Sequence, residues 1–233
     1  MSLSQFQTGQ GRSDMRVVFR AGAFAAIAML VIMAAQIVIF VIWPPPQTAG
    51  EMIALFNQNA ILGLLSMDFL YLINNGILVL IYLPLYLALR ESDRAWPLIA
   101  IIFGLVGIGA YYASNTSFEM LAISRQFAAA GTDAQRTALL GAGHAMMAVY
   151  KGTAFNVYYV LNAIALLIFA VVILRANVFS KSIGVTGLIA GILMTIPSTA
   201  GIVGMVFALA SLVPWAAFLA LLIPCFFRLS QMA

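Results

Sequence analysis

The sequence predicts an all-α fold: a polytopic membrane bundle of six transmembrane helices, with helices three and four extended outward as a helical hairpin. Hydrophobic residues make up 64% of the chain and charged residues only 8%, whereas soluble domains carry roughly 25% charged residues. Apolar runs long enough to cross a bilayer recur along the chain, which suits lipid as the solvent. The connections between these runs are alternately rich and poor in arginine and lysine, a pattern that sets orientation in a membrane.

The N-terminus is predicted to be a disordered cytoplasmic tail over residues 1–15, followed by a single transmembrane helical domain over residues 16–233. The first apolar run, residues 21–43, is longer than the signal-peptide core of roughly 7 to 15 residues. The three prolines that follow are not a small-residue cleavage site. We therefore expect a retained first span, ended by prolines that cannot continue a helix.

The second span is predicted from the apolar run at residues 60–89, which Asp68, Asn74 and Asn75 interrupt. It is preceded by a short connection in which Thr48 and Glu51 have the spacing of a capping box. This pattern predicts a small interfacial helix that ends near Asn57.

The remaining spans follow from three further apolar runs. The third span is predicted over residues 97–112 and the fourth over residues 152–174. The last stretch, residues 182–227, is long enough for two crossings of roughly 20 residues each. The break between these two crossings could lie at residues 197–199 or nearer residues 211–214.

The segment between spans three and four, residues 114–151, is alanine-rich and helical in character on both sides of a breaker at Gly131. Thr132 and Gln135 form a second capping-box pattern directly after that breaker. We therefore expect spans three and four to continue as one hairpin that turns at Gly131, with about 27 Å per arm at the helical rise. The hairpin could stand away from the membrane or fold onto its surface.

The basic residues predict the orientation. With the N-terminus in the cytoplasm, eight of the 11 basic residues lie inside, and only Arg125, Arg136 and Lys151 lie outside. We therefore expect both termini on the cytoplasmic side of the cell inner membrane. Because the basic residues lie at helix ends, the expected partners are membrane lipids with anionic headgroups, and no nucleic acid is expected.

Polar side chains on three predicted spans lie at one depth, in the outer half of the bilayer. Asp68, Tyr71 and Asn75 share one face of the second span, and polar groups inside a membrane usually face the bundle. The sequence therefore predicts a ligand-binding cavity that opens outward. Its predicted lining is Asp68, Tyr71, Asn75, Asn115, Glu119, Asn156 and Tyr159.

Three alternative interpretations of this polar layer stay open. Asp68 could be an interfacial carboxylate in headgroup water. The asparagines could hold the bundle together by interhelical hydrogen bonds. The whole layer could be an aromatic and amide belt at the interface.

Several kinds of site are excluded by residue counts. His144 is the only histidine and Cys225 the only cysteine, and zinc would need three or four ligands. No metal site and no cofactor are therefore expected, and a hydrolase site built from several histidines is excluded. The two lysines lie at helix ends, so no lysine is placed for a retinal, and no glycine-rich phosphate loop follows a strand.

Two pairs of small residues, Gly187 with Gly191 and Ala100 with Gly104, have the spacing that lets membrane helices approach closely. They could pack helices within the chain or form the seam of a homodimer or of a larger membrane complex.

Four segments carry a resemblance to a known family: residues 71–75, 111–119, 152–156 and 211–215. They resemble a bacterial family of multi-helix membrane proteins that is catalogued only as a domain of unknown function. The resemblance covers roughly residues 60–228. It implies a bacterial inner-membrane helical bundle and carries no activity with it.

Three functions are compatible with these observations. The first is a non-enzymatic binding or accessory role for a lipidic or small amphipathic ligand, or for a membrane partner. The second is a transporter or channel subunit, which would also need polar groups in the inner half. The third is an intramembrane enzyme that uses Asp68 or Glu119, and the sequence offers no second convergent group for it.

Overall fold

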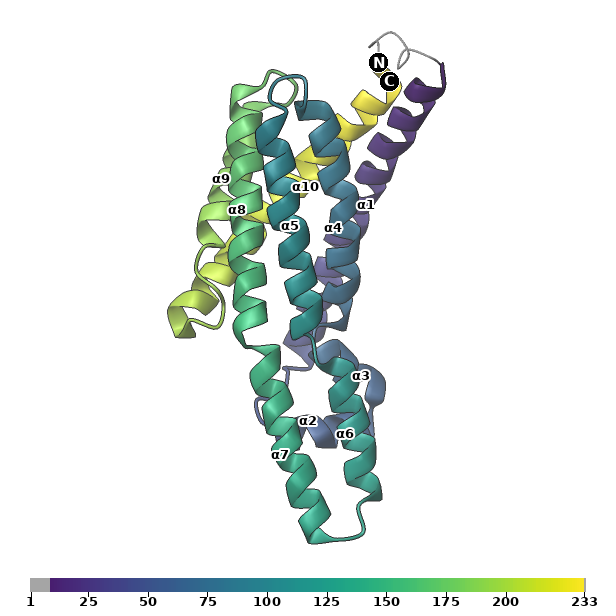
Figure 1. The fold of residues 1–233 in the computed structure, drawn as a ribbon, viewed down its shortest axis with the longest axis vertical. Helices are drawn as coiled ribbons and strands as arrows, with labels where there is room; N and C mark the ends of the chain where they lie inside the picture. The colour runs from purple at the N-terminus through teal and green to yellow at the C-terminus, as the bar shows by residue number, and fades with distance from the viewer. Residues whose placement is uncertain (1–8, 233) are drawn as a thin grey trace. The chain divides into compact units, whose positions relative to one another are not determined.

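The structure is a computed structural model that describes residues 9–232, and helices joined by short links account for all of them (Figure 1). The helices are α1 (Gly9–Ile42), α2 (Ala49–Gln58), α3 (Ala60–Ser66), α4 (Phe69–Leu89), α5 (Ala95–Ser114), α6 (Ser117–Ala129), α7 (Asp133–Tyr150), α8 (Thr153–Arg175), α9 (Lys181–Leu193) and α10 (Gly201–Met232). The all-α prediction is confirmed for this part of the chain. The predicted disordered tail begins in residues 1–8, which lie outside the described residues, whereas residues 9–15 belong to α1.

Five helical stretches of the described chain are long and apolar enough to cross a membrane: Ser13–Ile42, Phe69–Leu89, Ala95–Ala129, Asp133–Arg175 and Gly201–Met232. The third of these joins α5 to α6, and the fourth joins α7 to α8. The remaining apolar helix, α9, has 13 residues. It is therefore about 20 Å long, which is less than the hydrocarbon thickness of about 30 Å. The sequence predicted six full spans, and α9 is too short to be one by itself.

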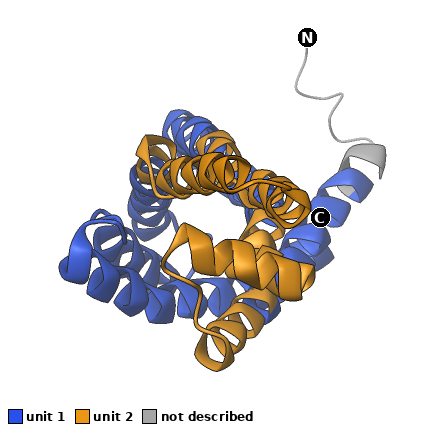
Figure 2. Cartoon of the chain, turned by 90° about the horizontal axis from the view of Figure 1, so that it is seen from below, with its two compact units in different colours: residues 1–31, 75–108, 159–233 blue, residues 32–74, 109–158 orange. Residues whose placement is uncertain are grey.

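The chain divides into two compact units (Figure 2). Unit 1 comprises residues 1–31, 75–108 and 159–233, and unit 2 comprises residues 32–74 and 109–158. Four helices, α1, α4, α5 and α8, contribute residues to both units.

Unit 1 has a large apolar core in which glycines let helices approach closely. A Cβ atom at Gly184 would lie 2.6 Å from Leu174 Cγ, and one at Gly191 would lie 2.8 Å from Leu167 Cδ2, so this face of α9 packs directly on α8. Gly187, between them, lies against Phe218 of α10 and Ala170 of α8. The small-residue pair on α9 therefore packs helices within the chain.

The second small-residue pair also packs within unit 1. Ala100 is fully buried, and a Cβ atom at Gly104 would lie 2.5 Å from the Tyr82 ring. This pair on α5 therefore lies against α4, as expected for packing inside a bundle.

The break between the last two helices is the link at residues 194–200. It contains the first of the two predicted positions. The second predicted position is inside α10, which continues through Pro214 and Pro224. Gly201 begins α10 with a φ of +65°, a left-handed conformation that glycine adopts without strain.

In unit 2, the predicted second span is broken in two. The capping box of Thr48 and Glu51 is present at the start of α2, as predicted. The side chain of Asn59 then caps α3, and α3 ends before Asp68, which has a φ of +59°. Because a left-handed residue cannot continue an α-helix, the apolar run becomes a short α3 and a longer α4.

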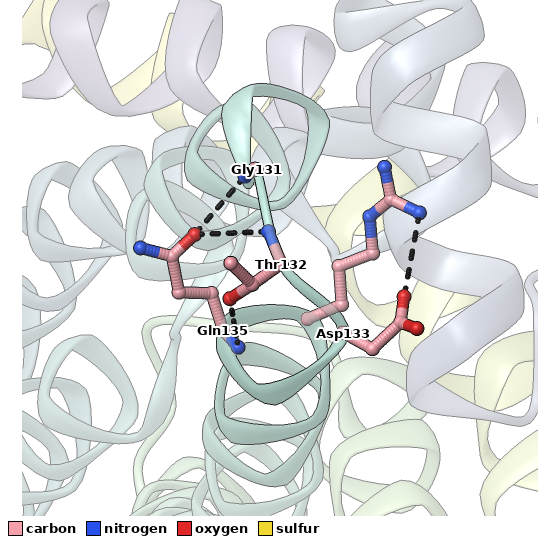
Figure 3. A network of polar contacts seen from close by, with 5 residues as sticks. Gly131, Thr132, Asp133 and Gln135 are labelled. Atoms are coloured by element: carbon pink, nitrogen blue, oxygen red, sulfur yellow. Dashed lines mark hydrogen bonds and ion pairs between the residues drawn. The ribbon is translucent and has the colours of Figure 1, made fainter.

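Helices α6 and α7 follow one another through a short link at residues 130–132 and pack together in unit 2. The predicted capping box is present: Thr132 Oγ1 accepts from the Gln135 N–H, and the Gln135 side chain accepts from the Gly131 and Thr132 N–H groups (Figure 3). The segment predicted to form two nearly continuous arms is helical, with additional breaks at residues 115–116 and 151–152.

Candidate functional site

Unit 2 gathers its polar side chains where three helices break. The breaks lie at Met67–Asp68 between α3 and α4, at Asn115–Thr116 between α5 and α6, and at Lys151–Gly152 between α7 and α8. A helix end leaves backbone carbonyl groups without a partner in the helix. In a membrane protein such groups must be satisfied by neighbouring side chains or by water.

Polar side chains near these breaks bond carbonyl groups at or near the ends of other helices. Asn115 Nδ2 donates to the Met67 carbonyl at 2.9 Å, and Thr116 Oγ1 donates to the Met146 carbonyl at 3.0 Å. Gln36, from the end of α1, donates to the Leu65 carbonyl at 3.2 Å. These bonds hold the helix ends of unit 2 in one layer.

Asp68 lies at the centre of this layer. Its carboxylate accepts a hydrogen bond from the hydroxyl of Tyr150, the last residue of α7. Its carbonyl accepts one from the Tyr111 hydroxyl at 3.5 Å. Burial raises the pKa of the Asp68 carboxyl to about 6, opposed by the hydrogen bond from Tyr150 and by the charge of Lys151.

Asp68 has a left-handed backbone conformation, with a φ of +59°. Glycine usually occupies such a position after a helix, because it has no Cβ atom. An aspartate there costs free energy relative to glycine. Its bond to Tyr150 ties the α3–α4 break to the end of α7.

Aromatic rings pack around Tyr111, whose hydroxyl donates to the Asp68 carbonyl. The ring centroids of Tyr111 and Tyr158 are 4.6 Å apart, and Phe155 lies 6.5 Å from Tyr111 and 6.1 Å from Tyr158. The Tyr112 hydroxyl donates to the Leu72 carbonyl at 3.1 Å. The tyrosines thus pack among themselves, and the hydroxyl groups of Tyr111 and Tyr112 donate to carbonyl groups at Asp68 and in the first turn of α4.

Five of the seven predicted site residues belong to unit 2: Asp68, Tyr71, Asn115, Glu119 and Asn156. Asp68 and Asn115 take part in the layer of helix breaks. Glu119 is exposed on α6. Asn156 Nδ2 donates to the Gly152 carbonyl at 3.0 Å, a local bond at the start of its own helix.

The other two predicted residues, Asn75 and Tyr159, belong to unit 1. Asn75 is buried on α4, and the Tyr159 hydroxyl is hydrogen-bonded to the Ser211 hydroxyl of α10. Unit 1 also contains a buried pair that the sequence analysis missed, in which the Tyr82 hydroxyl donates to Asn162 Oδ1 at 2.7 Å.

Tyr150 and Gln36 are the principal residues of unit 2 that the sequence analysis missed. Tyr150 is adjacent to Lys151, where a single charge in an apolar context was a sign of a helix end. Gln36 is the only strongly polar side chain in an otherwise apolar first span. This position indicates a hydrogen bond to another helix inside the bundle.

Three buried side-chain oxygen atoms among the described residues have no hydrogen-bond partner: Gln36 Oε1, Ser66 Oγ and Asn74 Oδ1. All three belong to unit 2. Each side chain is more than nine-tenths buried, so each oxygen carries a desolvation cost. In the described residues no group of three or more histidine, cysteine, aspartate or glutamate side chains could hold a metal ion.

A family model described as "Domain of unknown function (DUF4386)" matches residues 19–228. The chain belongs to the DUF4386 family. The match to DUF4386 begins within α1 and ends within α10, so it includes residues of both units and extends further towards the N-terminus than the resemblance found by inspection. Searches of curated proteins and of solved structures found no match. Membership of DUF4386, together with the five long apolar helices, describes a membrane protein whose family carries no assigned activity.

Proposed function

We propose that this DUF4386 protein is a non-enzymatic integral membrane protein of the cell inner membrane. In this proposal, unit 2 binds a lipidic or small amphipathic ligand, or a membrane partner, that presents hydrogen-bond donors. The observation that carries the proposal is the set of three buried, unpartnered oxygen atoms, on Gln36, Ser66 and Asn74. Two of these atoms are amide oxygens, which only accept hydrogen bonds. Their natural partner is a hydroxyl or ammonium group.

The apolar core of unit 2 supports a ligand with an apolar part. Three of its buried residues are methionines, Met52, Met67 and Met120, and two more methionines, Met146 and Met147, pack against them. Methionine side chains are unbranched and polarizable, so they repack around ligands of different shape. An amphipathic molecule would place its apolar part among these methionines and its donor groups at the unpartnered oxygens.

The decisive experiment removes two of the unpartnered oxygens. In the variant Ser66→Ala/Asn74→Leu we expect the ligand-free protein to keep or slightly gain stability, because two buried acceptors without partners are gone. We expect the same variant to lose the ligand that copurifies with the wild-type protein in mild detergent. Thermal unfolding and mass spectrometry of extracted small molecules measure the two effects.

Asn162→Leu is the matched control for that experiment, since Asn162 accepts a buried hydrogen bond from Tyr82 in unit 1. We expect it to lower stability by about 1–3 kcal/mol without changing ligand retention. A wild-type protein that carries no small molecule, or a double variant that retains its ligand, would overturn the proposal.

The proposed topology has six crossings with both termini in the cytoplasm. Support comes from the eight-to-three distribution of basic residues and from the packing of α9 on α8. We propose that α9 and the link at residues 194–200 together form the fifth crossing. Helices α6 and α7 would then form the outward hairpin.

Cysteine labelling tests this topology. In a Cys225→Ala background, we expect Thr132→Cys, in the α6–α7 link, to react with an impermeant maleimide added to the outside of cells or spheroplasts. We expect Ser92→Cys, in the α4–α5 turn, to react only after the membrane is opened. Reaction of the Thr132→Cys variant from the cytoplasmic side alone would refute the proposed topology.

A second candidate function, a transporter or channel subunit, is favoured by the short α9 and the irregular link that follows it. Helices interrupted within the membrane are typical of secondary transporters. Movement of the copurified ligand across proteoliposomes would favour this function over simple binding.

A further inference from the structure

Three segments that are distant in the sequence meet at one end of unit 1. The rings of Phe19 in α1 and Phe226 in α10 have centroids 6.3 Å apart. Phe179, in the link between α8 and α9, also lies 6.3 Å from Phe226, and Phe24 packs edge-on against Phe227 at 5.6 Å. The start of α1, the end of α10 and the α8–α9 link are therefore side by side at this end.

This aromatic cluster brings together basic residues that lie at separate helix ends in the sequence. Arg20 follows Phe19 and shares a helix face with Phe24, four residues later. Arg228 follows Phe227, and its Nη2 lies 3.5 Å from the Val178 carbonyl, so it reaches the α8–α9 link. Lys181 follows Phe179 by two residues and begins α9.

These three basic side chains are exposed, and none of them forms an ion pair within the described residues. Among the described residues, the two ion pairs join Arg90 to Glu91 and Arg136 to Asp133, and neither lies in these segments. The sequence contains no aspartate or glutamate after Asp133, so α8, α9, α10 and their links have none. The positive charge at this end of unit 1 is therefore not neutralised by the α8–α10 region itself.

Exposed apolar side chains adjoin the basic ones. Val17 and Phe24, on the same face of α1 as Arg20, are 65% and 61% exposed. Arg20 begins the apolar run of α1 and Arg228 ends that of α10, so these charges lie where the apolar surface stops. A surface with cations at its edge and apolar side chains beside them matches a phospholipid, which has an anionic phosphate joined to acyl chains.

We propose that Arg20, Lys181 and Arg228 form a binding site for the phosphate headgroup of an anionic phospholipid. Guanidinium groups match phosphate oxygens in a two-pronged geometry, which suits the two arginines. Lys181 adds a compact charge from the start of α9. The acyl chains of the lipid lie along the exposed face of α1. This site lies in unit 1 and is independent of the ligand proposed for unit 2.

Native mass spectrometry of the purified full chain tests the site. The protein is released from mixed micelles or nanodiscs that contain equal amounts of phosphatidylglycerol and phosphatidylcholine. We expect the wild-type protein to retain phosphatidylglycerol at least about tenfold more than phosphatidylcholine, because each basic group contributes favourably near an anionic surface. We expect Arg20→Gln/Lys181→Gln/Arg228→Gln to retain both lipids equally.

The control variant, Arg125→Gln/Arg136→Gln/Lys151→Gln, removes the same charge from unit 2. We expect it to retain phosphatidylglycerol as the wild-type protein does. Equal loss in both triple variants would mean that net charge, and no particular site, attracts the lipid, and this would overturn the proposal. Displacement of the wild-type signal by millimolar inorganic phosphate would identify a site for free phosphate and would also overturn it.

A second measurement starts from the wild-type protein. Phosphatidylglycerol should raise the unfolding temperature of the wild-type protein relative to phosphatidylcholine, because a ligand that binds only the folded state stabilises it. The single charge-conserving variant Arg228→Lys should keep most of this increase. An unfolding temperature that is the same in the two lipids would contradict the site.

Discussion

Replacing Gly184 by leucine should destabilise the protein by about 3 kcal/mol or more. A Cβ atom at this position would lie 2.6 Å from Leu174 Cγ and 3.1 Å from the Ala170 carbonyl oxygen. The second contact is with the backbone of α8, which cannot move aside as a side chain can. Because Gly187 and Gly191 hold the same face of α9 against its neighbours, the whole helix would have to shift. Thermal unfolding in detergent measures the loss.

Gly109→Leu is the matched control, since a Cβ atom at Gly109 in α5 would meet no other atom within 4 Å. Leucine has the higher helix propensity, so we expect this variant to be as stable as the wild-type protein or slightly more so. Equal stability of the Gly184→Leu and Gly109→Leu variants would contradict the close packing of α9 on α8.

The stability of the protein should fall as the pH rises from about 4 to 7, and Asp68 should be the cause. Burial raises the pKa of its carboxyl from 3.8 to about 6, so the folded chain binds this proton more tightly than the unfolded chain does. The stabilising contribution of the protonated group is complete below about pH 4 and is lost as the pH passes through 6. It amounts to about 3 kcal/mol at most, because solvent screens a half-buried group.

The variant Asp68→Asn isolates this effect. Asparagine tolerates the left-handed backbone of residue 68 and still offers an oxygen atom to the Tyr150 hydroxyl. Between pH 4 and pH 8, the unfolding temperature of Asp68→Asn should fall less steeply with pH than that of the wild-type protein. At pH 8 the variant should be the more stable of the two proteins. The control Asp133→Asn changes an exposed carboxylate on α7 and should leave the profile unaltered. A slope that persists in Asp68→Asn would assign the titration to another group.

Hydrophobic run length and capping chemistry made much of the fold predictable. The apolar runs predicted most of the long helices within a few residues, except that α1 begins at Gly9, well before its apolar run, and that α3 separates from α4. The two capping boxes placed the starts of α2 and α7, because a Thr side chain and a residue three positions later satisfy the same orphan N–H groups. The sequence left two positions open for the break before the last helix, and the one at residues 197–199 lies in the link before α10.

The helix breaks were not predictable in the same way. Asp68 interrupts an apolar run that is continuous in hydropathy, and it has a left-handed backbone together with tertiary bonds from Tyr111 and Tyr150 that the sequence does not reveal. Asn115 was predicted to line a cavity, whereas its side chain bonds the Met67 carbonyl. Sequence spacing gives the face of a helix on which a polar group lies. It does not say whether that group meets a ligand or the end of another helix.

Because α9 is short, the thickness of the bilayer determines which part of the α9–α10 region lies in the hydrocarbon. The helix ends about 20 Å from its first residue, and the seven residues that follow it, 194–200, have no regular backbone bonding pattern. Longer acyl chains bring more hydrocarbon around that link, and shorter chains leave more of it beside the headgroups. The resulting hydrophobic mismatch costs a fraction of a kcal/mol per ångström. Lipid chain length, which cells adjust with temperature and between membranes, therefore bears directly on the α9–α10 region.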